Sequence, residues 1–192
     1  MKTYLLLLSL LISSLAGIAQ PSVETREIEI LPESSLSITG NTNISQFECE
    51  FDTVCFEQQS LTVHYSSQGD ILDFKNSVLP LENTNFDCGN KRINKDFREL
   101  LKTENHPEIL LKIQKIEMNG QNNAHVTLNF EIAGKNKNYR FPVKVTGDDQ
   151  LCFEGNLALN IKDFNLEAPS KMFGLVVIEE EISINFKLNI KA

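Results

Sequence analysis

The chain has 192 residues, of which 26 are acidic and 18 basic, and its formal net charge at pH 7 is −8. A surface this acidic repels the phosphates of nucleic acids and the headgroups of anionic lipids, so we expect no nucleic-acid partner. Twelve Phe residues and no Trp indicate a folded core rather than a disordered acidic chain, because each buried Phe stabilises a fold by about 1.5–3 kcal/mol.

Residues 1–19 have the pattern of a secretory signal peptide. Lys2 supplies the positive charge, residues 4–18 are mostly apolar, and Gly17 and Ala19 are the small residues expected before a cleavage site. The apolar run is too short and wrongly flanked for a transmembrane anchor. We therefore expect cleavage after Ala19, a periplasmic or secreted location, and one mature domain of residues 20–192 with a net charge of −9.

The segment before residue 86 is predicted to form short β-strands. Apolar and polar side chains alternate with period 2, as in half-buried strands, over residues 26–30, 36–38, 47–51, 61–65 and 71–81. The last of these is expected to be irregular in its middle. Residues 40–43 are Gly-Asn-Thr-Asn, which tolerate positive φ, so a kink or bulge is predicted there.

Residues 91–102 are predicted to form a single amphipathic helix. Apolar residues recur at helical spacing, at Ile93, Phe97, Leu100 and Leu101. Asn90 or Asn94 is placed to cap its start, and the bend at residues 105–107 is expected to end it. Because such a helix must bury its apolar stripe and only strands surround it, we expect a lid or plug on a β structure.

The strand pattern resumes after the helix and is cleaner. Alternating residues cover 109–118, 124–132, 139–145, 151–161 and 182–190. The apolar positions change parity between Ile113 and Ile116, which predicts a bulge near Gln114 and Lys115. Asn119-Gly120 is a tight-turn dipeptide.

The predicted fold class is all-β, with about eight antiparallel strands and one helix. Each strand has one apolar face, so the sheet must close or fold over on itself, and closure removes exposed edges. Several strands reach ten residues, which favours an elongated eight-stranded β-barrel. Such a barrel is either filled by its own side chains or holds one small ligand.

Four cysteines remain in an exported chain, which indicates two disulfides with three pairings open. The strand face on which each cysteine lies favours Cys49–Cys88 and Cys55–Cys152, because Cys49 shares a face with Phe47 while Cys152 alternates with polar residues. The sequence does not decide between the pairings. A metal site is disfavoured, since there is no C-x₂-C spacing and the three His are scattered.

Six segments in fixed order resemble the YceI-like family. They are Gly40–Ile44 with Phe47, Gly89–Phe97, His106–Ile109, Phe153–Gly155, Asp163–Leu166 with Ala168-Pro169, and Gly174–Val176. The resemblance covers about residues 27–188, nearly the whole mature chain. It implies a lipocalin-like barrel, in bacterial periplasmic or secreted proteins, that binds polyisoprenoids and isoprenoid quinones in its lumen.

Transferred by motif and by strand face, the resemblance implies an apolar ligand site. The candidate ligand-binding residues are Phe47, Phe97, Phe130, Phe141, Phe153, Leu157, Phe173 and Phe186. The alternative is that each of them only fills the core. Ten buried methylene groups contribute about 8 kcal/mol gross, from which the ordering of the ligand is subtracted, so binding needs no charged contact.

No catalytic signature is present in the sequence. It contains no G-x-S-x-G, no H-E-x-x-H and no glycine-rich phosphate loop, so we expect a non-enzyme without catalytic cofactor or metal. The function expected is an exported carrier that holds a polyisoprenoid or isoprenoid quinone for transport, storage or sequestration. The alternative is a filled barrel that acts as an interaction module in envelope assembly or stress response. A homodimer and an envelope protein partner both stay open.

Overall fold

The computed structural model describes residues 22–56, 60–168 and 177–191. Its strands are β1 (Glu24–Ile30), β2 (Ser35–Thr42), β3 (Gln46–Phe51), β4 (Ser60–Gln68), β5 (Ile71–Glu82), β6 (Phe86–Asp87), β7 (Glu108–Met118), β8 (Asn123–Ile132), β9 (Lys135–Thr146), β10 (Gln150–Asn160) and β11 (Ile178–Lys191). The α-helix is α2 (Lys91–Leu100), and short 3₁₀ turns are η2 (Thr53–Phe56), η3 (Asn83–Asn85) and η4 (Ile161–Phe164). The predicted signal peptide and Phe173 lie outside the described residues.

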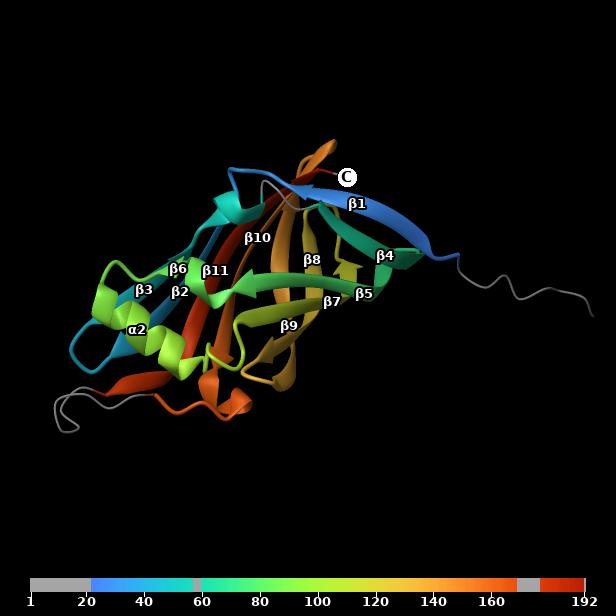
Figure 1. Cartoon of the computed structure of the whole chain (residues 1–192). Helices are drawn as coiled ribbons and strands as arrows, with labels where there is room; N and C mark the ends of the chain where they lie inside the picture. The colour runs from blue at the N-terminus through green and yellow to red at the C-terminus, as the bar shows by residue number, and fades with distance from the viewer. Residues whose placement is uncertain (1–21, 57–59, 169–176, 192) are drawn as a thin grey trace, which may run out of the picture.

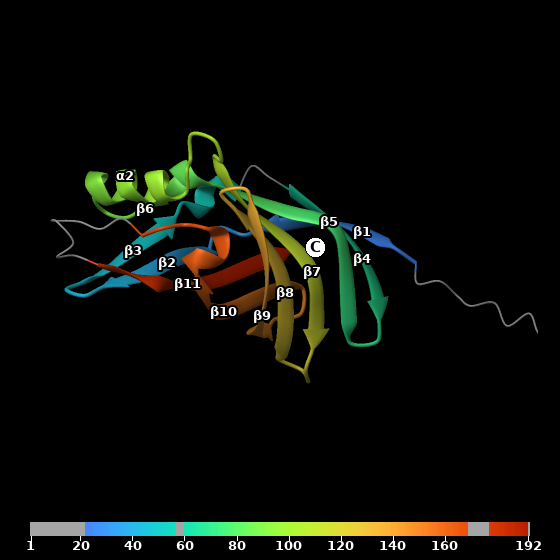
Figure 2. The ribbon, with the colours of Figure 1, turned by 90° about the horizontal axis from the view of Figure 1, so that it is seen from below.

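Eight of the strands form a closed antiparallel ring. Their order is β1, β4, β5, β7, β8, β9, β10 and β11, and β11 returns to β1 through the pairs Glu29–Lys191 and Ile30–Ile190. Figures 1 and 2 show these strands curving around a common interior. The predicted all-β fold with an eight-stranded ring and one amphipathic helix is confirmed.

Three further strands, β2, β3 and β6, lie outside the ring. The sequence pattern did not predict this position. β11 is 14 residues long, so one of its edges pairs with β1 at its last two positions and with β2 along residues 178–187. β3 pairs with β2, and β6 pairs with β3. The strands predicted at 36–38 and 47–51 therefore exist but belong to this extension, which lies beside α2 in Figure 1.

Two of the predicted irregularities are found, one where β7 pairs with β8 and one where β5 pairs with β7. Residue 114 is the extra residue of a bulge between the pairs Ile113–Leu128 and Lys115–Thr127, as predicted. On β5 the register shifts between Asp73 and Ser77, where Asn76 has φ of 53°.

The kink predicted at residues 40–43 is wrong in its position. β2 runs unbroken through Gly40, and the irregularity lies opposite, on β11 between Ile178 and Ile182. Gly40 has a packing role instead, because a Cβ atom there would come within 2.3 Å of Phe47 Cζ. The Phe47 ring therefore occupies the space above Gly40.

The helix begins as predicted and ends two residues early, at Leu100. The side chain of Asn90 accepts a hydrogen bond of 2.8 Å from the Arg92 N–H, which caps the first turn. The C-cap is Leu101, and Lys102 has φ of 55°, a left-handed conformation that stops the helix before residue 102.

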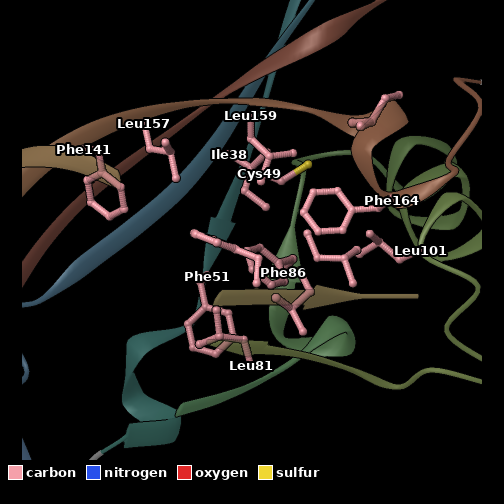
Figure 3. Close-up of a cluster of buried hydrophobic side chains, with 14 of the residues drawn as sticks. Ile38, Cys49, Phe51, Leu81, Phe86, Leu101, Phe141, Leu157, Leu159 and Phe164 are labelled. Atoms are coloured by element: carbon pink, nitrogen blue, oxygen red, sulfur yellow. The ribbon is translucent and has the colours of Figure 1, made fainter. Parts of the chain in front are cut away.

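A packed hydrophobic cluster lies between α2 and the ring. The rings of Phe51 and Phe86 lie 4.9 Å apart by centroids, and those of Phe86 and Phe97 lie 5.2 Å apart. Figure 3 shows Leu159 and Phe164 converging on the same cluster, and both are almost fully buried. The helix thus closes one end of the ring, in the position predicted for a lid or plug.

One disulfide joins the extension to the start of α2. Cys49 on β3 is bonded to Cys88, two residues before the cap of the helix, and both are buried. The predicted Cys55–Cys152 bond is absent, and each of these cysteines is a free thiol. Cys152 lies on β10 between Thr146 and Asn189, whereas Cys55 lies in η2, which pairs with no strand of that region.

Candidate ligand-binding cavity

A cavity of about 350 Å³ lies inside the ring. Its lining comes from the inward faces of all eight ring strands, from the start of β2 and from η2. Nearly all of the lining is hydrocarbon, and it includes the aromatic residues Phe56, Tyr65, Phe74, Phe130, Phe141, Phe153 and Phe186. The volume lies at the lower end of the range of ligand sites, about 300–1,000 Å³.

Five of the predicted site residues line this cavity. They are Phe130 on β8, Phe141 on β9, Phe153 and Leu157 on β10, and Phe186 on β11. They come together because alternate residues of a strand point to one face, and the ring places these four strands side by side. Whether these side chains contact a ligand stays a prediction.

Two predicted residues line a different space. Phe47 and Phe97 border a second cavity of about 70 Å³ beneath the helix, and neither borders the larger one. Phe47 is displaced because β3 lies outside the ring, and Phe97 because it belongs to α2. Phe173, the eighth candidate, lies outside the described residues.

A wall of side chains separates the two cavities. Both cavities are bordered by Leu36, Leu81, Leu111, Phe130 and Ile184. Phe130 is the largest of these and is 4% exposed. Its ring contacts Tyr139, with the ring centroids 5.6 Å apart at a near-perpendicular angle, so it is held in place from the neighbouring strand.

Gly155 makes room for one of the aromatic rings of the lining. It pairs with Phe186 across β10 and β11, and a Cβ atom at this position would lie 2.8 Å from Phe186 Cζ and 3.3 Å from Val143 Cγ1. The Phe186 ring also packs edge-on against Phe141, at a centroid distance of 5.9 Å. The glycine of the Phe153–Gly155 motif thus has a steric role in the lumen.

Sequence reasoning missed the lining that comes from the first half of the chain. Leu61, Val63 and Tyr65 on β4 and Leu72 and Phe74 on β5 all face the cavity. Their alternating pattern was recognised as strand, and extending the same parity argument to them would have placed them in the lumen.

Polar side chains occur at only a few places in the lining. Ser34 and Ser35 lie where the chain passes from β1 into β2, and Thr53 is the first residue of η2. Arg26 on β1 and Tyr65 on β4 lie on neighbouring strands, and the Arg26 side chain is 55% exposed. Arg26 is the charged residue of the lining, as far as the described residues show.

A separate polar cluster lies where β9 meets η4. The hydroxyl of Tyr139 donates to Asp163 Oδ2 at 2.7 Å, and Lys137 Nζ lies 3.2 Å from Asp163 Oδ1. Burial, together with the bond to Asp163, raises the pKa of Tyr139 to about 12. The same hydrogen bonds from Tyr139 and Lys137 lower the pKa of Asp163. This cluster lies outside both cavities, apart from the lining, and is a structural feature.

Other kinds of site receive little support from the geometry. Within the described ranges, no group of three or more His, Cys, Asp or Glu side chains is placed to hold a metal ion. No helix of the described chain has the length and hydrophobicity to cross a membrane.

Comparisons with known proteins agree with this architecture. The model of the family described as YceI-like domain matches residues 33–190. A solved structure of Burkholderia cenocepacia BcnA is similar with a TM-score of 0.62 at 19% identity, over 83% of this chain and 96% of that one. A polyisoprenoid binding domain from Saccharophagus degradans, described as implicated in plant cell wall breakdown, gives 0.62 at 13% identity, over 90% and 99%.

A third solved structure, the Campylobacter jejuni YceI protein, gives a TM-score of 0.54 at 12% identity, over 92% of this chain and 87% of that one. At sequence identities this low, the structural similarity shows a shared fold alone. A comparison with curated protein sequences finds no match.

Proposed function

The chain belongs to the YceI-like family, and from that premise and the cavity we propose that it binds a long apolar lipid in its lumen. The observation that carries the proposal is a cavity of about 350 Å³ bordered almost entirely by hydrocarbon. Apolar surface removed from water gains about 25 cal/mol per Å², so a lipid tail gains free energy along the whole lining. A dry, fully packed barrel, as the interaction-module alternative requires, would leave no such space.

The ligand class that fits best is a polyisoprenoid or an isoprenoid quinone. The similarity to a polyisoprenoid binding domain supports this class, and so does the lining, which combines branched aliphatic and aromatic side chains. We infer a non-catalytic role in an exported protein: transport, storage or sequestration of the lipid. Export rests on the signal-peptide pattern of residues 1–19.

Native mass spectrometry of the mature protein, purified from the envelope fraction or medium of its source and then extracted with organic solvent, tests the proposal. We expect an excess mass that extraction releases as a polyprenyl species. A bare mass, together with no uptake of added quinone or polyprenol, would contradict the proposal and favour the interaction module.

A matched pair of variants tests the location of the ligand. Phe153→Asn introduces an amide into the lining, and Glu154→Asn introduces the same amide on the opposite face of β10. We expect Phe153→Asn to lose most of the bound lipid and Glu154→Asn to keep it. Equal lipid content in two folded variants would show that the cavity is not the site.

A further inference from the structure

The inner face of β1 carries a charged side chain, that of Arg26, at the edge of a mostly apolar lining. Arg26, Ile28 and Ile30 alternate along β1 and all border the large cavity. β4 is the neighbouring strand, in register with Glu24 opposite Tyr65 and Arg26 opposite Val63, and Figures 1 and 2 both show the two strands side by side. The Arg26 and Glu24 side chains are 55% and 46% exposed, so this end of the lining meets solvent.

Three side chains at this edge are connected. The Tyr65 hydroxyl donates to Glu24 Oε2 at 2.9 Å, and Arg26 Nη2 lies 3.8 Å from the same oxygen. The Tyr65 ring lies against Phe74, with centroids 5.7 Å apart. Tyr65 thus holds the Glu24 carboxylate, and Arg26 keeps other guanidinium N–H donors available, because a guanidinium has five.

We propose that Arg26, with Glu24 and Tyr65, forms a docking site for the uncharged headgroup of the bound lipid, a carbonyl or a hydroxyl. The inference rests on the proposed function, since the tail must occupy the cavity for a headgroup to reach β1. A carbonyl accepts a hydrogen bond from Arg26, and a hydroxyl also donates to the carboxylate of Glu24.

The charges at this edge disfavour a phosphorylated headgroup. Arg26 and Glu24 together have no net charge, and the whole chain has a net charge of −8. A phosphate monoester carries about −1.5 to −2 charges at pH 7 and would lie beside the carboxylate of Glu24. An uncharged acceptor meets the guanidinium without this repulsion, so we expect the alcohol of a given tail to bind more tightly than its phosphate.

The experiment compares three probes with tails of equal length on the delipidated mature chain: geranylgeraniol, geranylgeranyl monophosphate and the corresponding hydrocarbon. In the wild type we expect the alcohol to bind most tightly. Arg26→Met should weaken alcohol binding about tenfold, the size of one hydrogen bond to a charged group, and should leave hydrocarbon binding unchanged. Lys144→Met is the matched control, because Lys144 is exposed on β9 between the buried residues Val143 and Val145.

A second variant tests the role of the carboxylate. Glu24→Gln removes the negative charge and keeps a hydrogen-bonding group, so monophosphate binding should tighten while alcohol binding changes little. The proposal is overturned if the wild type prefers the monophosphate, or if Arg26→Met leaves alcohol binding unchanged while the melting curve shows a folded protein. If the wild type binds none of the probes, the proposed function itself fails.

Discussion

The hydroxyl of Tyr139 lies in an unusual setting for a partly exposed tyrosine. Its ring packs between Phe130 and Phe164. Burial, together with the hydrogen bond that its hydroxyl donates to Asp163, raises its pKa from 10 to about 12. Ionisation of this hydroxyl would place a negative charge beside a carboxylate. The neutral form is therefore favoured in the folded state.

This raised pKa predicts a specific pH dependence. In the unfolded chain Tyr139 ionises near pH 10, and in the folded chain near pH 12, so its contribution to stability is complete below pH 10 and is lost as the pH rises towards 12. We expect the stability difference between wild type and Tyr139→Phe to shrink over this range, measured by denaturant unfolding at a series of pH values. Tyr65→Phe serves as the control for tyrosine removal in general. A difference that stays constant up to pH 12 would refute the assignment.

Gly155 lies so close to the Phe186 ring that a side chain there would clash with it. A methyl group there would meet the Phe186 ring at 2.8 Å, so Gly155→Ala must tilt the ring into the cavity or move β10. We expect a loss of about 1–3 kcal/mol in the free energy of unfolding, the usual cost of overpacking, and weaker lipid uptake.

The double variant Gly155→Ala with Phe186→Leu isolates the clash. If steric contact with this ring is the cause, the double variant should recover part of the stability that Gly155→Ala loses, measured as a coupling energy in a double-mutant cycle. Additive losses would mean that the alanine acts through the backbone rather than through Phe186.

At the scale of elements, the disulfide is the covalent link between the extension and the helix. Cys49 and Cys88 are 39 residues apart in the sequence. Closing a loop of this length lowers the entropy of the unfolded chain by an amount worth about 4 kcal/mol in the loop-entropy model. Cys88 is also held by its N–H, which donates to Asn94 Oδ1 at 2.6 Å, so the bond connects β3 to the first turn of α2.

We expect the double variant Cys49→Ala, Cys88→Ala to lose up to about 4 kcal/mol in the free energy of unfolding. Cys55→Ser with Cys152→Ser is the matched control, because these two cysteines are free thiols and their replacement should cost little. Thiol titration of the unfolded, unreduced wild type should find two reactive groups. If the control pair is the more destabilising one, the pairing is not as described.

The local pattern was sufficient for some features of these elements and insufficient for others. Period-2 alternation relates neighbouring residues of one strand, so it placed Phe141 and Phe153 correctly on the inward face. It carries no information on which strands become neighbours. For that reason Phe47 was assigned to the lumen although β3 lies outside the ring, and Cys55 was paired with Cys152 although both are free thiols.

Of the irregular positions in the strands, too, some could be predicted from the local pattern and others could not. The bulge at residue 114 changes the parity of the strand itself and was predicted. The shift on β11 between Ile178 and Ile182 belongs to the pairing of that strand with β2, opposite Gly40 and Thr42. A feature of that kind becomes visible only once the sheet is assembled.

At the scale of the whole molecule, the wall between the two cavities determines how far a lipid tail can extend. Five side chains border both the 350 Å³ and the 70 Å³ spaces, and Phe130 is the bulkiest of them. A tail whose headgroup lies at Arg26 on β1 would run towards this wall. The smaller cavity beyond the wall is closed by Phe97, Leu100 and Leu101 at the helix.

We therefore predict that Phe130 sets the longest tail that is bound with full contact. In the wild type, affinity for prenyl alcohols should rise with each added isoprene unit and then level off once the tail reaches the wall. Phe130→Ala should join the two cavities and move this plateau to longer tails. The measurement is a series of dissociation constants for alcohols of increasing length.

Phe141→Ala is the control that separates length from volume. It removes the same ring from the large cavity, but Phe141 does not border the smaller one. Each Phe→Ala change should cost about 3–5 kcal/mol of stability, so both variants are compared at a temperature where they are folded. If the two variants shift the plateau equally, the lumen responds only to added volume. A shift confined to Phe130→Ala would mean that the length of the bound tail is limited by the Phe130 side chain in the wall, with the cavity that the helix closes lying beyond it.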